Sequence, residues 1–258
     1  MGSPLPLLVL AGVLGLAIGS FLNVVIYRVP RNESIVTPAS RCPSCDATLK
    51  PWHNVPVVSW LALRGKCAFC GTQISARYPL VEAGTAVLFI AMTLRFGLHL
   101  ELPAYLFLVA VGLTLALIDV DMQRLPNAIV LPSYVVAVSL LMPAGAVNGD
   151  WRSAVRALAG MAALAAIYFA LSIVYPHGLD GGDVKVAGFV GLYLGWISWS
   201  AVLVGAIGAL VIGAVGGSVL SLLPAGRAER SGRAGRDGAT LAFAPCLVAS
   251  AVLTLFIA

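Results

Sequence analysis

Two aspartates far apart in the sequence stand beside apolar runs that are long enough to cross a membrane. Asp119 ends one such run, and Pro126-Asn127 marks a chain break before the next. Asp183 follows a glycine pair and precedes another apolar run. Ionisable residues beside spanning segments are costly, so both aspartates are functional candidates. Brought together, two carboxyl groups would share one proton and act as base towards water and acid towards a peptide bond, which is aspartic protease chemistry.

Simpler explanations exist for these and for other ionisable residues. On residue type alone, the aspartate pair is explained equally well as helix caps and loop acids. Asp121 is two positions after Asp119 and cannot share its face if the helix continues, so we interpret it as a solvated residue. Glu82 lies where a further apolar run begins, either as an interfacial ion-pair partner or as a substrate contact. His53 and His177 are interpreted as solvated or hydrogen-bonded residues and not as catalysts.

Four cysteines form two CxxC pairs, Cys42/Cys45 and Cys67/Cys70, separated by 21 residues. Each pair can form a tight knuckle that points two thiolates at one metal, and two knuckles complete a tetrahedral zinc site. Two disulfides, a redox pair or free thiols are the alternatives, although a cytoplasmic location disfavours disulfides. The spacing favours a structural zinc site. The fifth cysteine, Cys246, is interpreted as a small packed side chain in an apolar span.

The composition indicates that these residues are positioned by membrane helices. The chain has 258 residues, of which 60% are hydrophobic and 10% are charged. A spanning helix needs about 20 mostly apolar residues. Eight segments are candidate spans, with uncertain ends: residues 5–27, 79–97, 102–119, 128–145, 153–175, 186–199, 201–223 and 240–258. The sixth is short, and one bent hydrophobic hairpin is the alternative for the sixth and seventh. The sequence therefore predicts an all-α polytopic membrane protein with about eight transmembrane helices and a small cytoplasmic zinc-binding domain inserted after the first.

The basic residues predict how these helices are oriented. Most of them lie in the loops 28–78 and 224–239, and few lie in 98–101 and 146–152. The positive-inside rule then places the N-terminus outside, with the cysteine loop and both aspartates at the cytoplasmic face. The first apolar run has Arg28 after it and no basic residue before it, the reverse of a secretory signal, so we interpret it as a retained helix. Topology accounts for the net charge of +5 without nucleic-acid binding.

The predicted organisation has three parts. Residues 1–27 form the first transmembrane helix, 28–78 the cytoplasmic four-cysteine domain, and 79–258 the membrane-embedded domain that carries both aspartates. The middle part is too small to bury a large apolar core, so its folding is expected to depend on the bound metal.

Taken together, the motifs identify a family. The chain resembles the bifunctional prepilin peptidases, also called type IV leader peptidases, over nearly its whole length. The matching stretches are GSFLNVVIYR at 19–28, the two CxxC pairs, NVPVVSWLALRGKC at 54–67, RYPLVE at 77–82, the segments around Asp119 and Asp183, and AFAP at 242–245.

The resemblance implies an enzyme of the bacterial cytoplasmic (inner) membrane. It would cut the leader from type IV prepilins or pseudopilins after a glycine at the cytoplasmic face. It would also methylate the new N-terminal amine, often that of phenylalanine, with S-adenosylmethionine as methyl donor. The catalytic pair carries over as Asp119 and Asp183. Asp119 is chosen over Asp121 because the family's first acid lies eight residues before the Asn or Asp that follows Pro, here Asn127.

Two departures leave other functions open. Asp180 replaces the first glycine of the family's Gly-x-Gly-Asp motif, and a tight left-handed turn there would strain an aspartate. Ala244 replaces a frequent glycine. The alternatives are a peptidase without methyltransferase activity, a catalytically impaired relative or adaptor owing to Asp180, and a transporter or proton channel. The chain lacks a Gly-rich Rossmann motif, so methylation rests on the resemblance and the cysteine loop.

Overall fold

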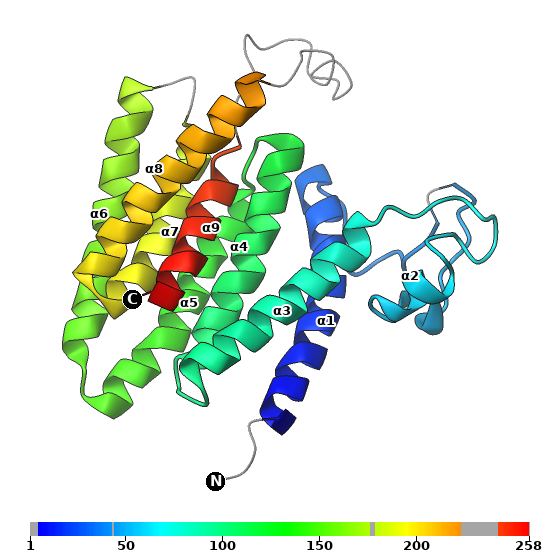
Figure 1. Cartoon of the computed structure of the whole chain (residues 1–258), viewed down its shortest axis with the longest axis horizontal. Coiled ribbons are helices and arrows are strands. Elements are labelled where there is room, and N and C mark those ends of the chain that lie inside the picture. Colours follow the sequence, from blue (N-terminus) through cyan, green and yellow to red (C-terminus); the bar gives the residue numbers. More distant parts are fainter. Residues whose placement is uncertain (1–4, 43, 176–178, 223–241, 258) are drawn as a thin grey trace. The chain divides into compact units, whose positions relative to one another are not determined.

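The computed structural model describes residues 5–42, 44–175, 179–222 and 242–257. The chain divides into two compact units, Met1–Thr114 and Leu115–Ala258, and each is considered by itself below. The described residues form helices joined by loops (Figure 1). Helix α4 (Leu102–Met122) begins in the first unit and ends in the second.

The first unit is built on a close pair of apolar helices, α1 (Leu5–Arg28) and α3 (Arg77–Phe96). Two glycines of α1 one turn apart permit this packing. A Cβ atom on Gly15 would lie 2.5 Å from the Cα of Ala86, and one on Gly19 would lie 2.7 Å from the Cα of Glu82. Small residues spaced in this way let helix backbones approach closely in a membrane, where dispersion contacts and not water drive association.

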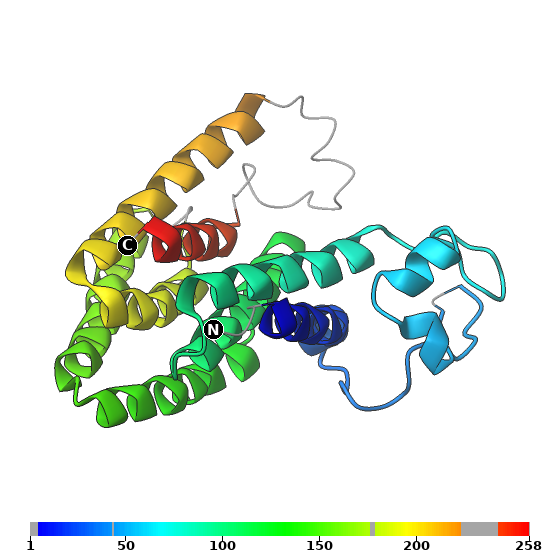
Figure 2. The same cartoon turned by 60° about the horizontal axis from the view of Figure 1, so that its bottom comes forward.

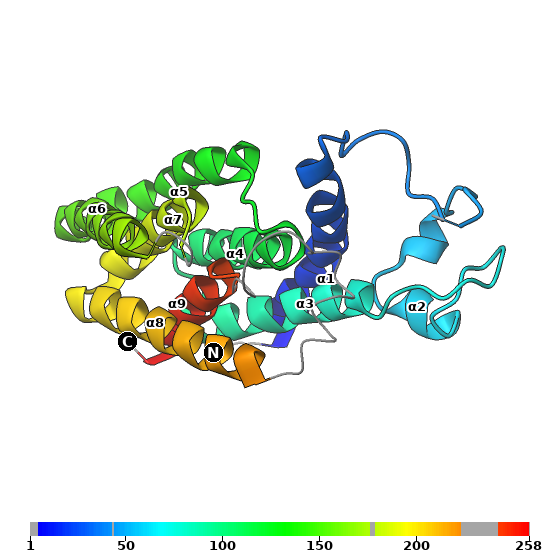
Figure 3. The same cartoon turned by 90° about the horizontal axis from the view of Figure 1, so that it is seen from above.

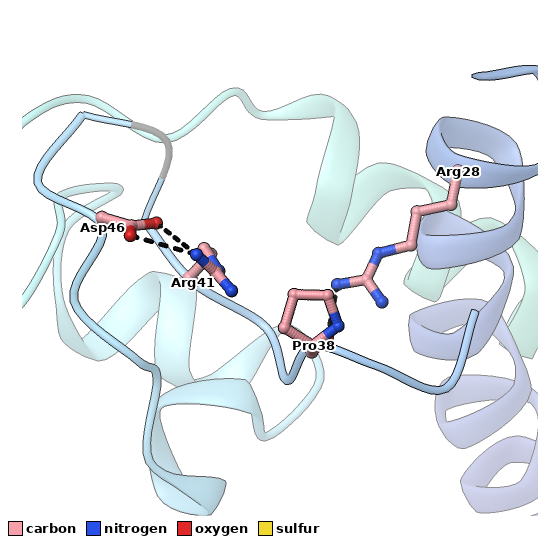
Figure 4. A network of polar contacts seen from close by, with 4 residues as sticks. All are labelled: Arg28, Pro38, Arg41 and Asp46. Carbon is pink, nitrogen blue, oxygen red and sulfur yellow. Dashed lines mark hydrogen bonds and ion pairs between the residues drawn. The ribbon is translucent and has the colours of Figure 1, made fainter. Parts of the chain in front are cut away.

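The long connection between α1 and α3 contains three short helical turns: η1 (Val29–Arg31), η2 (Pro51–Asn54) and α2 (Val58–Ala62). Its first part is tied to α1 by Arg28, which donates to the carbonyl oxygens of Ser34 and Pro38 at 2.9 and 2.8 Å. Figure 4 shows Arg28 reaching this segment, and further along it the ion pair of Arg41 with Asp46 at 2.9 Å. These contacts are exposed, so they order the loop without contributing much stability.

The second unit surrounds one buried helix. Besides the end of α4 it contains α5 (Asn127–Asn148), α6 (Trp151–Val174), α7 (Gly181–Ile197), α8 (Trp199–Leu222) and α9 (Ala244–Ile257). Figure 3 shows α7 between the α5–α6 hairpin and the α8–α9 pair, and Figure 2 shows α9 alongside α8. Most of α7 is buried, and Gly191 packs against the backbone of Gly160 on α6.

Arg156 closes the C-terminal end of α7. Its guanidinium donates to the carbonyl oxygens of Gly195, Trp196 and Ile197 at 2.7, 2.6 and 2.8 Å. The last carbonyls of a helix have no partner within the helix, and a guanidinium with five donors can satisfy several at once. Arg156 therefore ties α6 to the end of α7 that lies opposite Asp183.

The predicted fold class is confirmed. Each of the eight predicted spans is a helix, and predicted spans six and seven are separate helices divided at Ser198. Among the described residues, six helices are long and apolar enough to cross a membrane: α1, α3, α4, α5, α6 and α8. The other two, α7 and α9, have 17 and 14 residues. The chain is thus a multi-pass membrane protein.

Candidate active site

Asp119 lies in the last turn of α4 and is only 6% exposed. Its Oδ2 accepts a hydrogen bond of 3.0 Å from the backbone N–H of Ala244, the first residue of α9. The N-terminus of a helix carries unpaired N–H groups and partial positive charge, so this contact favours the ionised carboxylate. The departure at Ala244 does not affect it, because the contact uses the backbone N–H group and not the side chain.

Asp183 lies in the first turn of α7 and is 7% exposed. Its Oδ2 accepts from the backbone N–H of Asp180 at 3.1 Å, and the Asp180 side chain accepts from Gly182 N. This reciprocal arrangement is a capping box that fixes the start of the helix. The other oxygen of Asp183, Oδ1, is buried and has no hydrogen-bond partner among the described residues.

The expected strain at Asp180 is absent. Its φ and ψ of −114° and 174° are extended, a conformation open to any residue, because it serves as the N-cap of α7. The tighter position of the motif is Gly182, where a Cβ would lie 3.0 Å from the Leu125 side chain, which would have to shift. The substitution of glycine by Asp180 is thus compatible with an intact helix start.

The structure brings Asp119 and Asp183 together within the second unit. The two carboxyl groups interact electrostatically, and both act on the buried thiol of Cys246 on α9. Asp121 is exposed, whereas Asp119 is buried. Two buried carboxyl groups, one with an oxygen free of hydrogen bonds, can hold a proton between them and activate a water molecule.

Two contacts that tie the N-terminal part of α7 to α5 were missed by sequence reasoning. The Nζ of Lys185 donates to Asn127 Oδ1 at 2.8 Å and so links the start of α7 to the start of α5. Tyr134 on α5 donates its hydroxyl to the Lys185 carbonyl oxygen. Both contacts join residues more than 50 positions apart, so local spacing gave no signal for them.

The four cysteines of the loop converge on one point in the first unit. All four Sγ atoms lie within 4.8 Å of one another, with Cys42 and Cys70 Sγ 3.8 Å apart. Tetrahedral zinc with Zn–S bonds of about 2.3 Å requires sulfurs about 3.8 Å apart. The two knuckles match, since Cys42 and Cys67 each accept at their carbonyl oxygen from the N–H four residues on, at 2.9 and 3.0 Å. None of the four forms a disulfide.

The thiols of this cluster differ in acidity. Hydrogen bonds with the Thr72 side chain and backbone lower the pKa of Cys70 to about 6. Although the backbone hydrogen bond with Ala47 lowers it, desolvation within the cluster and the three neighbouring thiols raise the pKa of Cys45 to about 12. Four thiolates cannot coexist in this space without a cation, and a divalent metal would deprotonate all of them. The donor set thus fits zinc.

The remaining sequence candidates do not join the aspartate pair. His53 packs edge-on against the rings of Trp52 and Phe69 in the cysteine loop. Glu82 is buried on α3, in the first unit, and accepts from the backbone N–H of Val57 at 2.7 Å. His177 lies outside the described residues.

Fold and site together define a multi-pass membrane protein with a buried aspartate pair and a separate four-cysteine loop. Two family models match the chain: "Bacterial Peptidase A24 N-terminal domain" over residues 13–96 and "Type IV leader peptidase family" over residues 106–221. The first range contains the four cysteines and Glu82, and the second contains both aspartates.

Several curated proteins are similar to this chain, each named "Prepilin leader peptidase/N-methyltransferase". One from Myxococcus xanthus is 42% identical over 84% of this chain and 63% of its own length. Another from Stutzerimonas stutzeri is 36% identical over 75% of each chain, and one from Pseudomonas putida is 36% identical over 81% of each. No solved structure matches. The chain therefore belongs to the type IV leader peptidase family and is an enzyme of the aspartic peptidase class.

Proposed function

We propose that the chain removes the leader from type IV prepilins or pseudopilins by a two-aspartate mechanism and then methylates the new N-terminal amine. The observation that carries the first activity is the buried pair of Asp119 and Asp183, which interact electrostatically in the second unit. Family membership and the names of the relatives support both activities.

The geometry suggests how the pair would divide the chemistry. The ionised carboxyl group takes a proton from water, and the water oxygen bonds to the peptide carbonyl carbon. The protonated group donates its proton to the leaving nitrogen as the C–N bond breaks. Asp119 is held by the N–H of Ala244, which favours its ionised form, and the Oδ1 of Asp183 is free of other hydrogen bonds and can carry the shared proton.

The methyltransfer activity is assigned to the first unit. S-adenosylmethionine supplies an electrophilic methyl group on a sulfonium. Zinc held by Cys42, Cys45, Cys67 and Cys70 would fold the loop that joins α1 and α3 and so support that site.

The proposed location is the bacterial inner membrane, with the N-terminus outside. The loop 28–78, rich in basic residues, then faces the cytoplasm, and the ends of the helices that carry the aspartates do as well. In this orientation the cleavage after glycine takes place at the cytoplasmic face, where prepilin leaders reside.

The test is to incubate the purified, detergent-solubilised protein with a prepilin and S-adenosylmethionine and to read the product by mass spectrometry. Loss of the leader after glycine with one added methyl group is the expected result. A folded, metal-loaded protein that leaves a proven prepilin intact would contradict the proposed peptidase. Cleavage without any added methyl group would support the peptidase activity and contradict the methyltransferase activity.

A further inference from the structure

Glu82 is the buried acid of the first unit. The described residues of this unit include four acids, and Glu33, Asp46 and Glu101 are exposed or partly exposed, whereas Glu82 is only 8% exposed. It lies in the second turn of α3, where α3 packs against α1 at Gly19. Burying a carboxylate in this position costs free energy, so a functional role is expected for it. A structural ion pair does not explain it, because no described cation pairs with Glu82.

The groups that do face Glu82 are hydrogen-bond donors without charge. From α1 the side chain of Ser20 lies close to it, and from the loop the backbone N–H of Val57 donates to Oε2 at 2.7 Å. On the same face of α1, Asn23 donates to the Tyr78 carbonyl oxygen at 3.1 Å and ties the two helices together at this end. A carboxylate can accept about four hydrogen bonds, so acceptor positions remain for a further partner.

The donor at Val57 is held in a strained conformation. Its φ and ψ of 61° and −48° lie in a region that a β-branched residue rarely adopts. Backbone strain of this kind is typical of active sites and ligand clamps. The turn that covers Glu82 is also a surface turn, because the side chains of Val55 and Val58 beside it are exposed. The carboxylate is thus covered by the strained turn at Val57 as well as by α1.

We propose that Glu82 is the residue that receives the N-terminal ammonium of the cleaved pilin and takes its proton in the methyltransfer step. The inference rests on the proposed methyltransferase function. An ammonium cation is the partner that a buried, unpaired carboxylate would bind most strongly. An α-amine has a pKa of about 8, so at neutral pH most of it is protonated and has no lone pair for attack on a methyl group.

The ammonium passes one proton to the Glu82 carboxylate and becomes a neutral amine. The amine nitrogen forms a bond to the methyl carbon while the carbon–sulfur bond of the donor breaks and its electron pair stays on sulfur, which becomes a thioether. The protonated Glu82 then releases its proton to water. The aspartate pair has no part in this step, so cleavage and methylation are separable.

The experiment compares wild type with Glu82→Gln, which keeps an oxygen acceptor for the Val57 N–H but has no negative charge and is not a base. With cleaved pilin and S-adenosylmethionine at pH 7, methylation should fall by about 100-fold while prepilin cleavage by the same preparation is unchanged. Raising the pH from 7 to 9 should recover about tenfold of the lost rate, because the amine then deprotonates without help. Glu101→Gln, a partly exposed acid of the same unit, is the matched control and should methylate normally.

A binding measurement without methyl donor separates amine recognition from activity. A peptide of the mature pilin N-terminus should bind Glu82→Gln about tenfold more weakly than wild type, and its N-acetylated form should bind both equally. Normal methylation by Glu82→Gln would overturn the proposal, and so would a deficit that is the same at pH 7 and 9 with unchanged peptide binding, since that indicates a structural role. Wild type that cleaves but never methylates would overturn the methyltransferase function itself.

Discussion

The two units use buried carboxylates in different ways. In the second unit, Asp119 and Asp183 come from two helix ends, interact with each other, and both accept from backbone N–H groups. In the first unit, Glu82 has no acidic partner and accepts from the strained turn at Val57. A pair can share one proton and catalyse hydrolysis of a peptide bond, whereas a single buried carboxylate is suited to binding a cation. This difference is what the proposed division into two reactions at two sites requires.

The units also differ in how their sites are held in place. The aspartates stand on helices that bury one another, with α7 enclosed by its neighbours. The four-cysteine loop has only short helical turns and exposed polar contacts. Its main tertiary contact is the meeting of its four cysteine side chains. The aspartate site in the second unit is thus expected to survive metal removal, and the four-cysteine loop in the first unit is not.

The largest effect is expected from Asp183→Asn. Loss of one ionisable carboxyl group should lower prepilin cleavage by about 10²–10⁴-fold, because the pair can no longer serve as both acid and base. Methylation of a pilin that has already been cleaved should stay at the wild-type rate. Mass spectrometry of both reactions on one preparation checks this. Parallel loss of the two activities would contradict the assignment of cleavage and methylation to different units.

Removal of the metal should give the next largest effect, in the other unit. Cys42→Ser removes a buried ligand, so we expect the bound zinc to fall from about one per chain to near zero and methylation to be lost with it. Cleavage should be retained. Metal content is measured by atomic emission on the purified variant, with Cys246→Ser as the control that keeps its metal. A metal-free variant that methylates normally would contradict the stabilising role.

The pH at which zinc leaves should depend on Thr72. Its hydrogen bond lowers the pKa of Cys70, so the thiolate persists and keeps its metal as the pH falls. Thr72→Val removes that hydrogen bond, raises the pKa of Cys70, and should move the midpoint of zinc release to higher pH. A zinc-sensitive dye followed through an acid titration gives the midpoint. An unchanged or lower midpoint would show that Thr72 does not tune the site.

A smaller effect is expected at Arg156. Arg156→Met removes the donors to three carbonyl oxygens at the end of α7 and leaves these groups without partners. The stability of the second unit should fall by about 1–3 kcal/mol, seen as a lower unfolding temperature in detergent. The zinc site should be unaffected. Equal loss of zinc and of helical structure on heating would mean that the two units do not unfold separately.

The smallest effect is expected from Asp180→Gly. Glycine is nearly as good an N-cap as aspartate, at a cost of a few tenths of a kcal/mol, so cleavage should change by less than about threefold. Cleavage kinetics with one prepilin compare the two forms. A gain of tenfold or more would instead identify Asp180 as the cause of an impaired site.

The sequence predicted the helices well and the contacts between them poorly. Each apolar run of sufficient length became a helix, because length and hydrophobicity decide whether a segment can cross a bilayer. The extended backbone of Asp180 was not predicted, although an acid three residues before Asp183 is the pattern of a capping box. The contacts of Asp119 with Ala244 and of Glu82 with Val57 depend on tertiary packing, and no local spacing encodes them.

The most direct test of the two-aspartate site compares Asp119→Asn and Asp121→Asn in one cleavage assay with a single prepilin. The two residues are two positions apart, and one is buried whereas the other is exposed. Loss of cleavage in Asp119→Asn with activity close to wild type in Asp121→Asn is the predicted result. An inactive Asp121→Asn beside an active Asp119→Asn would show that the buried pair described above is not the catalytic one.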